Sequence, residues 1–301
     1  MISLRVPATT ANVGPAFDAL GIALSLYNHI QVEVIPQGVE IEVIGRDQAL
    51  IVKDESNLIY QSMLKAYRAA GQKPPGIQLR LHNEIPLGRG LGSSAAAIVG
   101  GLAAANYLMG SPLSQDALLE LAVAQEGHPD NVAPALLGGV VISCKGSKKT
   151  ETIGFPVNER LGFYAAVPDQ VLSTAEARAV LPPHVSHGEA VFNVGRTALL
   201  VAALCSGNFG PLVTALEDKL HQPYRFQLMP DLKSILEESE KRGLKNLFLS
   251  GAGPTVMLMD CHGGASVPLF QEVLELLPGK WELLKLTGDN QGVQQVDISH
   301  L

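Results

Sequence analysis

The sequence predicts an α+β protein built in two halves, and three observations support this. At 301 residues the chain is about twice as long as a typical domain. Stretches that alternate apolar and polar residues, as half-buried strands do, are interleaved with stretches of helical spacing. The two kinds do not alternate regularly, as they would in a doubly wound parallel sheet. We place the boundary in the polar, lysine-bearing turn at Ser147–Thr150, which divides the chain into domains of residues 1–150 and 151–301.

The first half contains five predicted strands and three predicted helices. Alternating or apolar runs predict strands at residues 2–6, 28–35, 39–45, 77–85 and 138–144. Between the second and third of these, Pro36–Gly38 predicts a hairpin turn. Helical spacing predicts helices at residues 57–70, 94–109 and 114–125. Gly71 is the expected C-cap of the first helix, and Ser114 is the expected N-cap of the third.

The second half differs from the first, with shorter predicted strands and more predicted helix. Apolar runs predict strands at residues 161–167, 246–249 and 256–259. Helical spacing predicts helices at residues 188–205, 212–220, 232–242 and 268–277. Internal repeats and low-complexity segments are absent from the sequence, so the two halves are different folding units.

The composition excludes several classes of protein. Hydrophobic residues make up 47% and charged residues 17%, the opposite of what disorder requires. A net charge of −7 argues against nucleic acid as the main partner, because phosphate binding needs a basic face. The N-terminus has no apolar signal, and the most apolar stretch, residues 95–109, is shorter than the ~20 residues of a membrane span. We therefore expect a cytoplasmic protein without a nucleic-acid or membrane partner.

The cysteines agree with that location. Cys144, Cys205 and Cys261 stand far apart, without the spacing of metal ligands. Their odd number and wide separation favour a reducing compartment, in which we expect buried thiols.

The segment Pro86–Ala97, PLGRGLGSSAAA, is the most informative. Three glycines follow a predicted strand, and a helix of small residues begins at Ser93–Ser94. Glycines let backbone N–H groups approach a ligand, and a helix N-terminus adds free donors, so the pattern predicts a phosphate-binding loop. The loop lacks the lysine of a Walker A motif, and the same pattern also suits a tight strand-to-helix turn. One serine hydroxyl could ligate Mg²⁺.

Three other segments carry weaker signals. Glu126–Asn131, EGHPDN, offers Glu126 or Asp130 as a Mg²⁺ ligand, although an ordinary polar loop would have the same composition. Asn12–Asp18 has one carboxylate in an apolar run and suits an Asx turn equally well. Leu249–Thr255 predicts a glycine loop between two strands, either functional or merely close-packed. Arg178 and Arg225, each taken alone, are typical of surface arginines.

Together these segments resemble the GHMP kinase superfamily. PLGRGLGSSAA is similar to its ATP-phosphate motif and LSGAGPT to its C-terminal glycine motif. VPATTANVGPAFDALG, EGHPDNVAPALLGG and DKLHQPYR resemble the homoserine kinase branch in particular. The resemblance runs from Arg5 to Met259. One departure is Ala16, where the family usually has glycine, and alanine is unfavourable there only if the position needs a positive φ.

The resemblance implies a fold, a reaction and two substrates. The fold would be the two-domain GHMP kinase fold, with an N-terminal ribosomal-protein-S5-like ATP-binding domain and a C-terminal ferredoxin-like domain. The protein would bind ATP in the syn form with Mg²⁺ and transfer the γ-phosphoryl group to the side-chain hydroxyl of L-homoserine, a step toward threonine. The family also often forms homodimers.

Matching the family's motifs assigns residues to each substrate. Ser94 and Glu126 would hold Mg²⁺. Residues expected to bind ATP are Asn57, Leu58, Pro86, Leu87, Gly88, Arg89, Gly90, Leu91, Gly92, Ser93, Ser94, Ala95 and Ala96. Residues expected to bind homoserine are His128, Thr174, Arg178, Arg225 and Gly253. Residues expected to act at the reacting hydroxyl are Asn12, Asp18, Asp130 and Asn131.

The resemblance leaves the proton transfer and the acceptor open. In mevalonate-type kinases an aspartate of the DN segment is proposed as general base, whereas homoserine kinases have no clearly placed base. We favour late loss of the hydroxyl proton to the phosphate itself. The alternative functions are a sister kinase for a mevalonate-type acid and a non-catalytic GHMP-fold binding protein. An intact serine pair and Glu126 disfavour the latter, because a binding module needs no metal ligands.

Overall fold

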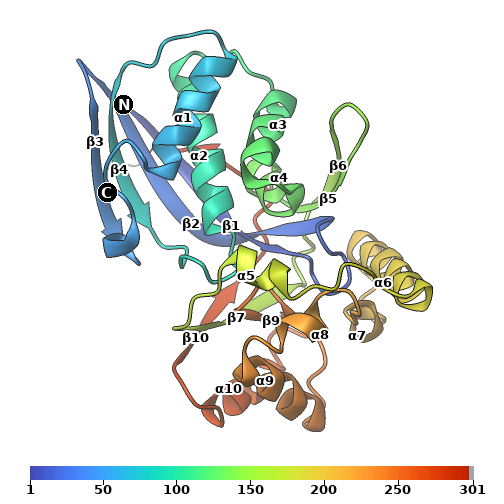
Figure 1. Cartoon of the computed structure of the whole chain (residues 1–301). Coiled ribbons are helices and arrows are strands. Elements are labelled where there is room, and N and C mark those ends of the chain that lie inside the picture. Colours follow the sequence, from blue (N-terminus) through green and yellow to red (C-terminus); the bar gives the residue numbers. More distant parts are fainter. Residues whose placement is uncertain (298–301) are drawn as a thin grey trace.

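The computed structural model of the chain describes residues 1–297 and confirms an α+β architecture with two sheets (Figure 1). The strands of the first sheet are β1 (Ile2–Ala11), β2 (Leu20–Ile35), β3 (Val39–Gly45), β4 (Gly76–Asn83), β5 (Val140–Lys145), β6 (Thr150–Phe155) and β11 (Gln294–Gln295). The strands of the second sheet are β7 (Gly162–Pro168), β8 (Leu247–Leu249), β9 (Val256–Asp260) and β10 (Trp281–Leu286).

The helices of the first half are η1 (Gln48–Leu50), α1 (Leu58–Ala69), α2 (Ser93–Leu108), α3 (Gln115–Glu126) and α4 (Pro129–Leu137). Those of the second half are α5 (Thr174–Ala179), α6 (His187–Ser206), α7 (Leu212–Ala215), α8 (Gln222–Arg225), α9 (Pro230–Lys241) and α10 (Val267–Glu275). The expected N-cap Ser114 is confirmed, since its hydroxyl accepts a hydrogen bond from the amide of Ala117. The C-cap of α1 is Ala70, and the expected C-cap Gly71 is the next residue, at φ +69°. Helix α7 ends earlier than the predicted 212–220, and β1 and β2 are longer than the predicted strands at 2–6 and 28–35. The elements that were not predicted are η1, α4, α5, α8, β6, β10 and β11.

The expected hairpin at Pro36–Gly38 is wrong. Strand β4 lies between β2 and β3, pairing antiparallel with β2 and parallel with β3. The reason is burial: Ile77, Leu79 and Leu81 of β4 are at most 4% exposed, so β4 takes a central place. Strand β3, with its alternating glutamates, forms the edge. Helix α1 then makes the crossover that a parallel pair requires.

The second sheet has the order β10-β7-β9-β8, with all neighbours antiparallel. Its βαββαβ chain order, with α9 and α10 as the helices, is ferredoxin-like and agrees with the expected C-terminal fold. The expected boundary at 147–150 coincides with the β5–β6 turn, inside the first sheet. The chain passes to the second sheet only after Phe155, and β11 returns to pair with β1.

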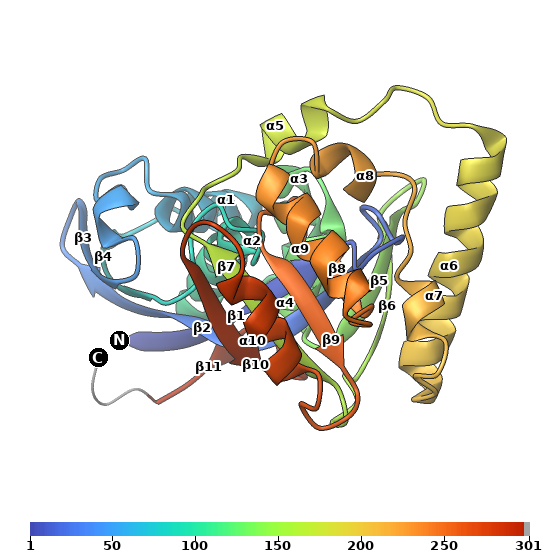
Figure 2. The ribbon, with the colours of Figure 1, turned by 90° about the horizontal axis from the view of Figure 1, so that it is seen from below.

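Each sheet is covered by its own helices. Helices α1 to α4 lie over one face of the first sheet, and α9 and α10 lie over the second (Figures 1 and 2). The larger hydrophobic core includes β1, β2 and α2 together with Phe163, Met257 and Met259 of the second sheet. Because this core is continuous between the halves, the loops at their junction are held in fixed relation to one another.

Cys144 and Cys205 are exposed and Cys261 is partly exposed, so the expected buried thiols are wrong; all three are free. Among the described residues, α6 is the one helix that is long and apolar enough to cross a membrane, judged by length and composition alone. Of its most apolar 18-residue stretch, 22% is buried. Figure 2 shows α6 beside α7 at the edge of the molecule.

Candidate functional site

The segment between β4 and α2 has the geometry of an anion-binding loop. Gly88, Gly90 and Gly92 have φ of +63°, +76° and +70°, a conformation that favours glycine. Gly92 is the N-cap of α2 and supplies no side-chain hydrogen bond. The first helical bond runs from the amide of Ala96 to the carbonyl of Gly92, so the amides of residues 93–95 are free to donate to a ligand.

The second domain fixes this loop in place. The Ser250 hydroxyl donates to the carbonyl of Gly90 (2.6 Å), and the Thr255 hydroxyl donates to the carbonyl of Arg89 (2.5 Å). The guanidinium of Arg89 donates to the Asp47 carboxylate (3.1 Å) and the carbonyl of Pro168 (3.0 Å). The predicted glycine loop at 249–255 is therefore confirmed between β8 and β9, where it supports the phosphate-binding loop.

Not every residue predicted for ATP faces open space. A cavity of about 330 Å³ is lined by Asn57, Leu58, Leu87, Gly88 and the serine pair Ser93–Ser94. Pro86, Leu91, Ala95 and Ala96 line neither this cavity nor the one beside it, and their side chains are buried. Because the amide of Ala96 is bonded within the helix, that residue is withdrawn as a phosphate ligand.

The wall of this cavity contains residues that sequence reasoning missed. Leu50 and Val52 line it and are 65% and 47% exposed, as is Leu58 at 38%. Exposed apolar side chains around a concave surface suit a flat apolar ligand such as a nucleobase. Asn57 is buried and caps α1, accepting from the amide of Ile59 (2.9 Å) and donating to the carbonyl of Val52 (2.7 Å). Its amide group thus holds the wall together. The only sequence signal for Leu50–Val52 was an apolar run just before a helix cap.

A second cavity, of about 100 Å³, adjoins the phosphate-binding loop and is lined by polar side chains. It brings together every residue predicted for the acceptor: Asn12, Asp18, His128, Asp130, Asn131, Thr174, Arg178, Arg225 and Gly253. They come from the β1–β2 loop, the start of α4, α5, α8 and the 250–255 loop. Glu126 and Ser94 also line this cavity, and the Ser94 hydroxyl donates to Glu126 Oε2 (2.8 Å).

The β1–β2 loop is strained where it lines the cavity. Asn12, Val13 and Asp18 have φ of +68°, +40° and +54°, which is costly for residues other than glycine and is often found at functional sites. The Asn12 amide compensates by donating to the carbonyl of Gly251 (2.8 Å) and accepting from the amide of Asp18 (2.9 Å). Ala16 is not among the positive-φ residues, so alanine fits there without strain.

Asp18 and Arg178 form a two-pronged ion pair across the junction of the halves. The two guanidinium nitrogens of Arg178 lie 2.7 and 2.9 Å from the two carboxylate oxygens of Asp18. Both side chains are about one-third exposed. Bidentate pairs of this kind have a fixed orientation as well as charge attraction, so the Arg178 guanidinium is held in place at the wall of the cavity.

Arg225 is the most unusual residue of the site. It is 1% exposed, so the interpretation as a surface arginine is wrong. It donates from Nε to the carbonyl of Ala177 (3.2 Å) and from Nη1 to the carbonyl of Gly251 (2.9 Å) and to His221 Nδ1 (3.0 Å). Within residues 1–297, no carboxylate forms an ion pair with it, and Nη2 has no protein partner. Burial, together with the charge of Arg178, lowers its pKa to about 10.

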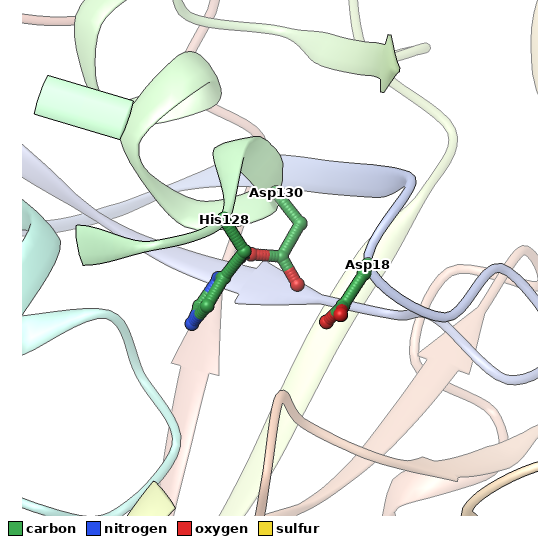
Figure 3. A group of neighbouring side chains, drawn as sticks. All are labelled: Asp18, His128 and Asp130. Atoms are coloured by element: carbon green, nitrogen blue, oxygen red, sulfur yellow. Dashed lines mark hydrogen bonds and ion pairs between the residues drawn. The ribbon is translucent and has the colours of Figure 1, made fainter. Parts of the chain in front are cut away.

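Figure 3 shows the acidic side of the cavity, where Asp18 faces the pair His128 and Asp130. Pro129 and Asp130 occupy the first turn of α4, where proline and an acid are favoured. His128 Nδ1 makes a short hydrogen bond to Asp130 Oδ1. Burial lowers the pKa of His128, but the bond to Asp130 and the charges of Asp130, Glu126 and Asp18 raise it more, to a net increase.

Two groups of side chains offer the kinds of atoms that bind a cation. Ligand atoms of Asp18, His128 and Asp130 lie within 4.8 Å of one another, but His128 and Asp130 bond each other and Asp18 bonds Arg178. Ser94 and Glu126, by contrast, present a hydroxyl and a carboxylate oxygen at the mouth of the phosphate-binding loop. One carboxylate beside phosphate oxygens is the usual arrangement for Mg²⁺, so the residues at this second place fit the ion.

The chain matches two family models. Residues 57–139 match the GHMP kinases N terminal domain, and residues 200–260 match the GHMP kinases C terminal model. A homoserine kinase of Caldicellulosiruptor saccharolyticus is 46% identical over 296 residues, covering 97% of this chain and 96% of that protein. A homoserine kinase of Carboxydothermus hydrogenoformans is 47% identical over 265 residues, covering 88% of this chain and 87% of that one.

Solved structures of related kinases have the same fold as this chain. The homoserine kinase from Cytophaga hutchinsonii superposes with a TM-score of 0.88 at 28% identity, covering 98% of this chain and 97% of that chain. The mevalonate kinase of L. major, solved in complex with R-mevalonate, has a TM-score of 0.72 at 15% identity, covering 95% of both chains. The latter likeness concerns the fold alone.

Proposed function

Since this chain belongs to the homoserine kinase family of the GHMP kinases, and is an ATP-dependent small-molecule kinase, we propose that it uses the two adjoining cavities to phosphorylate L-homoserine. The larger cavity takes the nucleotide, with the triphosphate along Gly88–Ala95. The smaller, polar cavity takes homoserine with its hydroxyl toward the loop. The product is O-phospho-L-homoserine, in a step of threonine biosynthesis.

The observation that carries this proposal is the buried, unpaired guanidinium of Arg225. A buried charge is costly unless it is paired, and Arg225 has hydrogen bonds but no directly paired anion within residues 1–297, since the carboxylates of Asp18, Asp218 and Asp130 act on it only at longer range. The carboxylate of an amino acid supplies that anion at Nη2. Asp18 supplies the opposite charge for the ammonium group, because each oxygen of its carboxylate has a further lone pair besides the one that accepts from Arg178. A zwitterionic acceptor therefore complements both charges.

Mg²⁺ fits between the two cavities. The Ser94 hydroxyl and the Glu126 carboxylate would hold it, each as an oxygen ligand beside the phosphates. When bound, the ion would neutralise negative charge on the β- and γ-phosphates. The protein's own contribution there is to hold the two oxygens next to each other, as the 2.8 Å hydrogen bond between them shows.

The remaining residues orient the acceptor. The hydroxyl oxygen forms a bond to the γ-phosphorus while the bond to the leaving ADP oxygen breaks, and the hydroxyl proton passes late to the transferred phosphoryl group. Asn131, which accepts a bond from the Thr9 hydroxyl (2.8 Å), and Asp130 are placed to orient the hydroxyl. Asn12 acts through the loop, because its amide group is bonded to Gly251 and Asp18. Such transfers depend on positioning and charge stabilisation more than on a strong base.

The test is ADP release with a panel of acceptors, with and without Mg²⁺. We expect Mg²⁺-dependent turnover with L-homoserine and little with mevalonate, which has a carboxylate but no ammonium group. Preference for mevalonate, or for 4-hydroxybutyrate over homoserine, would contradict the acceptor. ATP binding without turnover of any acceptor would favour a non-catalytic binding protein instead.

We also propose that the protein is cytoplasmic and forms a homodimer. Three free cysteines are compatible with a reducing compartment such as the cytoplasm, and the net charge of −7 opposes nucleic-acid binding. A homodimer follows from the family resemblance. Fractionation of cells would test the first of these, and light scattering of the purified protein the last.

A further inference from the structure

His221 lies behind Arg225, on the side away from the acceptor cavity. It is the residue before α8 and is fully buried. Its Nδ1 lies 3.0 Å from Arg225 Nη1, and its Nε2 lies 2.7 Å from the carbonyl oxygen of Gly14. A guanidinium can only donate and a carbonyl can only accept. The ring must therefore accept at Nδ1 and donate at Nε2, which assigns a neutral imidazole and one tautomer.

The surroundings keep this ring neutral. Burial lowers the pKa of His221, and the charge of Arg225 adds to that effect against the charge of Asp218. Asp218 Oδ2 is 3.5 Å from Nε2, but it accepts the amides of His221 (3.0 Å) and Gln222 (2.7 Å) at the start of α8. Its Oδ1 accepts from Asn193 Nδ2 (2.7 Å) and the amide of Leu220 (2.8 Å). Asp218 is therefore satisfied without a proton from the ring.

Phe17 completes the packing around the two cations. Its ring stacks on His221, with centroids 5.3 Å apart and planes at 30°. The guanidinium carbons of Arg225 and Arg178 lie 5.3 and 5.4 Å from its centroid. Gly14 and Phe17 belong to the same loop as Asp18, so His221 joins that loop to Arg225 through one hydrogen bond on each side of its ring.

We propose that His221 is a positioning residue for the acceptor: it holds the guanidinium of Arg225 so that Nη2 faces the carboxylate of the substrate, and thereby sets the preference for acceptors that have a carboxylate. His221 itself does not contact the substrate. This inference rests on the proposed function, because it requires Arg225 to bind the acceptor's carboxylate.

Two nearly isosteric substitutions separate the two halves of the ring. In His221→Asn the side-chain oxygen takes the place of Nδ1, which keeps the acceptor for Arg225 and loses the donor to Gly14. In His221→Gln the amide nitrogen takes the place of Nε2, which keeps the donor to Gly14 and loses the acceptor for Arg225. A merely structural role for His221 predicts similar effects from both changes.

The experiment measures kcat and KM for L-homoserine, for ATP, and for 3-aminopropan-1-ol, which is homoserine without its carboxylate. We expect His221→Gln to raise the KM for homoserine about tenfold or more and to reduce the preference for homoserine over 3-aminopropan-1-ol by a similar factor. The KM for ATP should stay the same. His221→Asn should remain within about threefold of the parent in each quantity.

Equal effects of the two changes, or a larger effect of His221→Asn, would overturn the proposal. A parent enzyme that does not use homoserine at all would instead contradict the proposed function. Nitrogen NMR of the parent protein labelled in histidine gives a test that does not depend on the variants folding. The expected signal for His221 is a protonated Nε2 and a bare Nδ1, and a protonated Nδ1 would overturn the proposal.

Discussion

The nucleotide cavity and the acceptor cavity adjoin, yet the groups expected to bind each substrate differ: backbone groups on one side and polar side chains on the other. The phosphate end of the nucleotide cavity is one contiguous loop, Pro86–Ala95, in which glycine backbone and a helix N-terminus supply the donors. The acceptor side is made of charged and amide side chains from five places in the chain, held by bonds such as Asp18–Arg178. If the proposed assignment holds, the difference teaches that the backbone binds the phosphates, whereas side chains select the acceptor. Mutations should therefore separate the two functions.

Loss of the nucleotide site should give the largest effect. In Gly92→Val, a residue with φ of +70° would gain a Cβ only 1.9 Å from the Thr9 hydroxyl, so the loop must distort and ATP binding should be abolished. Calorimetry measures the affinity, with circular dichroism as the check on folding. Gly38→Val is the matched control, because Gly38 has φ of +79° but nothing near its Cβ.

Gly88→Ala provides the same test if Gly92→Val does not fold. The added Cβ at residue 88 would meet only the side chain of Val171, which can move. Normal ATP affinity in both loop variants would remove Pro86–Ala95 from the nucleotide site.

Removal of the metal ligand ranks second, since it affects the reaction more than binding. Glu126→Gln keeps the shape of the side chain and the bond from Ser94, but it removes the negative charge. We expect kcat to fall at least about 100-fold at saturating Mg²⁺, while the calorimetric affinity for homoserine hardly changes. An unchanged kcat would exclude Glu126 as a metal ligand.

The acceptor side should give an intermediate effect confined to one substrate. Arg225→Leu removes a charge-assisted contact worth about 2–3 kcal/mol, so the KM for homoserine should rise roughly 30- to 150-fold. Arg178→Leu should raise it strongly too, but less than Arg225→Leu, because Arg178 is about one-third exposed and paired with Asp18. The KM for ATP should be unaffected in both. A comparable rise in the KM for ATP would mean that the two cavities are not separable.

Asp18 should decide which acceptor is preferred. Asp18→Asn keeps an acceptor oxygen but removes the charge that faces the ammonium group, so the enzyme's use of homoserine should fall by about tenfold relative to 4-hydroxybutyrate, which lacks that group. The ratio of kcat/KM for the two acceptors is the readout. An unchanged ratio would mean that Asp18 does not recognise the ammonium group.

The smallest effect is expected at Asn57, where the side chain serves structure. Asn57→Ala removes the N-cap of α1 and should lower the free energy of unfolding by about 1 kcal/mol, as measured by urea denaturation. Ser114→Ala, at the cap of α3, is the control, since it should cost a similar amount without any change in nucleotide affinity. Loss of ATP binding far beyond this cost would give Asn57 a direct role.

The same contrast explains what the sequence could predict. The glycine loop was recognisable from Pro86–Ala97 because neighbours in sequence are neighbours in the site, and the capped helices followed from local signals at Ser114 and Gly71. The strand order could not be predicted, because β4 lies between β2 and β3 as a result of burial against residues far away in the sequence. Arg225 alone suggested a surface residue, since nothing in HQPYR reveals that α8 is buried against Gly251. Only the family resemblance predicted a place for it beside the acceptor, and its hydrogen bond to His221 needed the structure.

The most direct test of this separation is calorimetric titration of two ligands into two variants. L-homoserine and a non-hydrolysable ATP analogue are each titrated into the parent, Arg225→Leu and Gly88→Ala proteins. The account predicts a crossed pattern: Arg225→Leu loses affinity for homoserine and keeps the nucleotide, whereas Gly88→Ala weakens the nucleotide and keeps homoserine. Parallel losses of both ligands in both variants would contradict it.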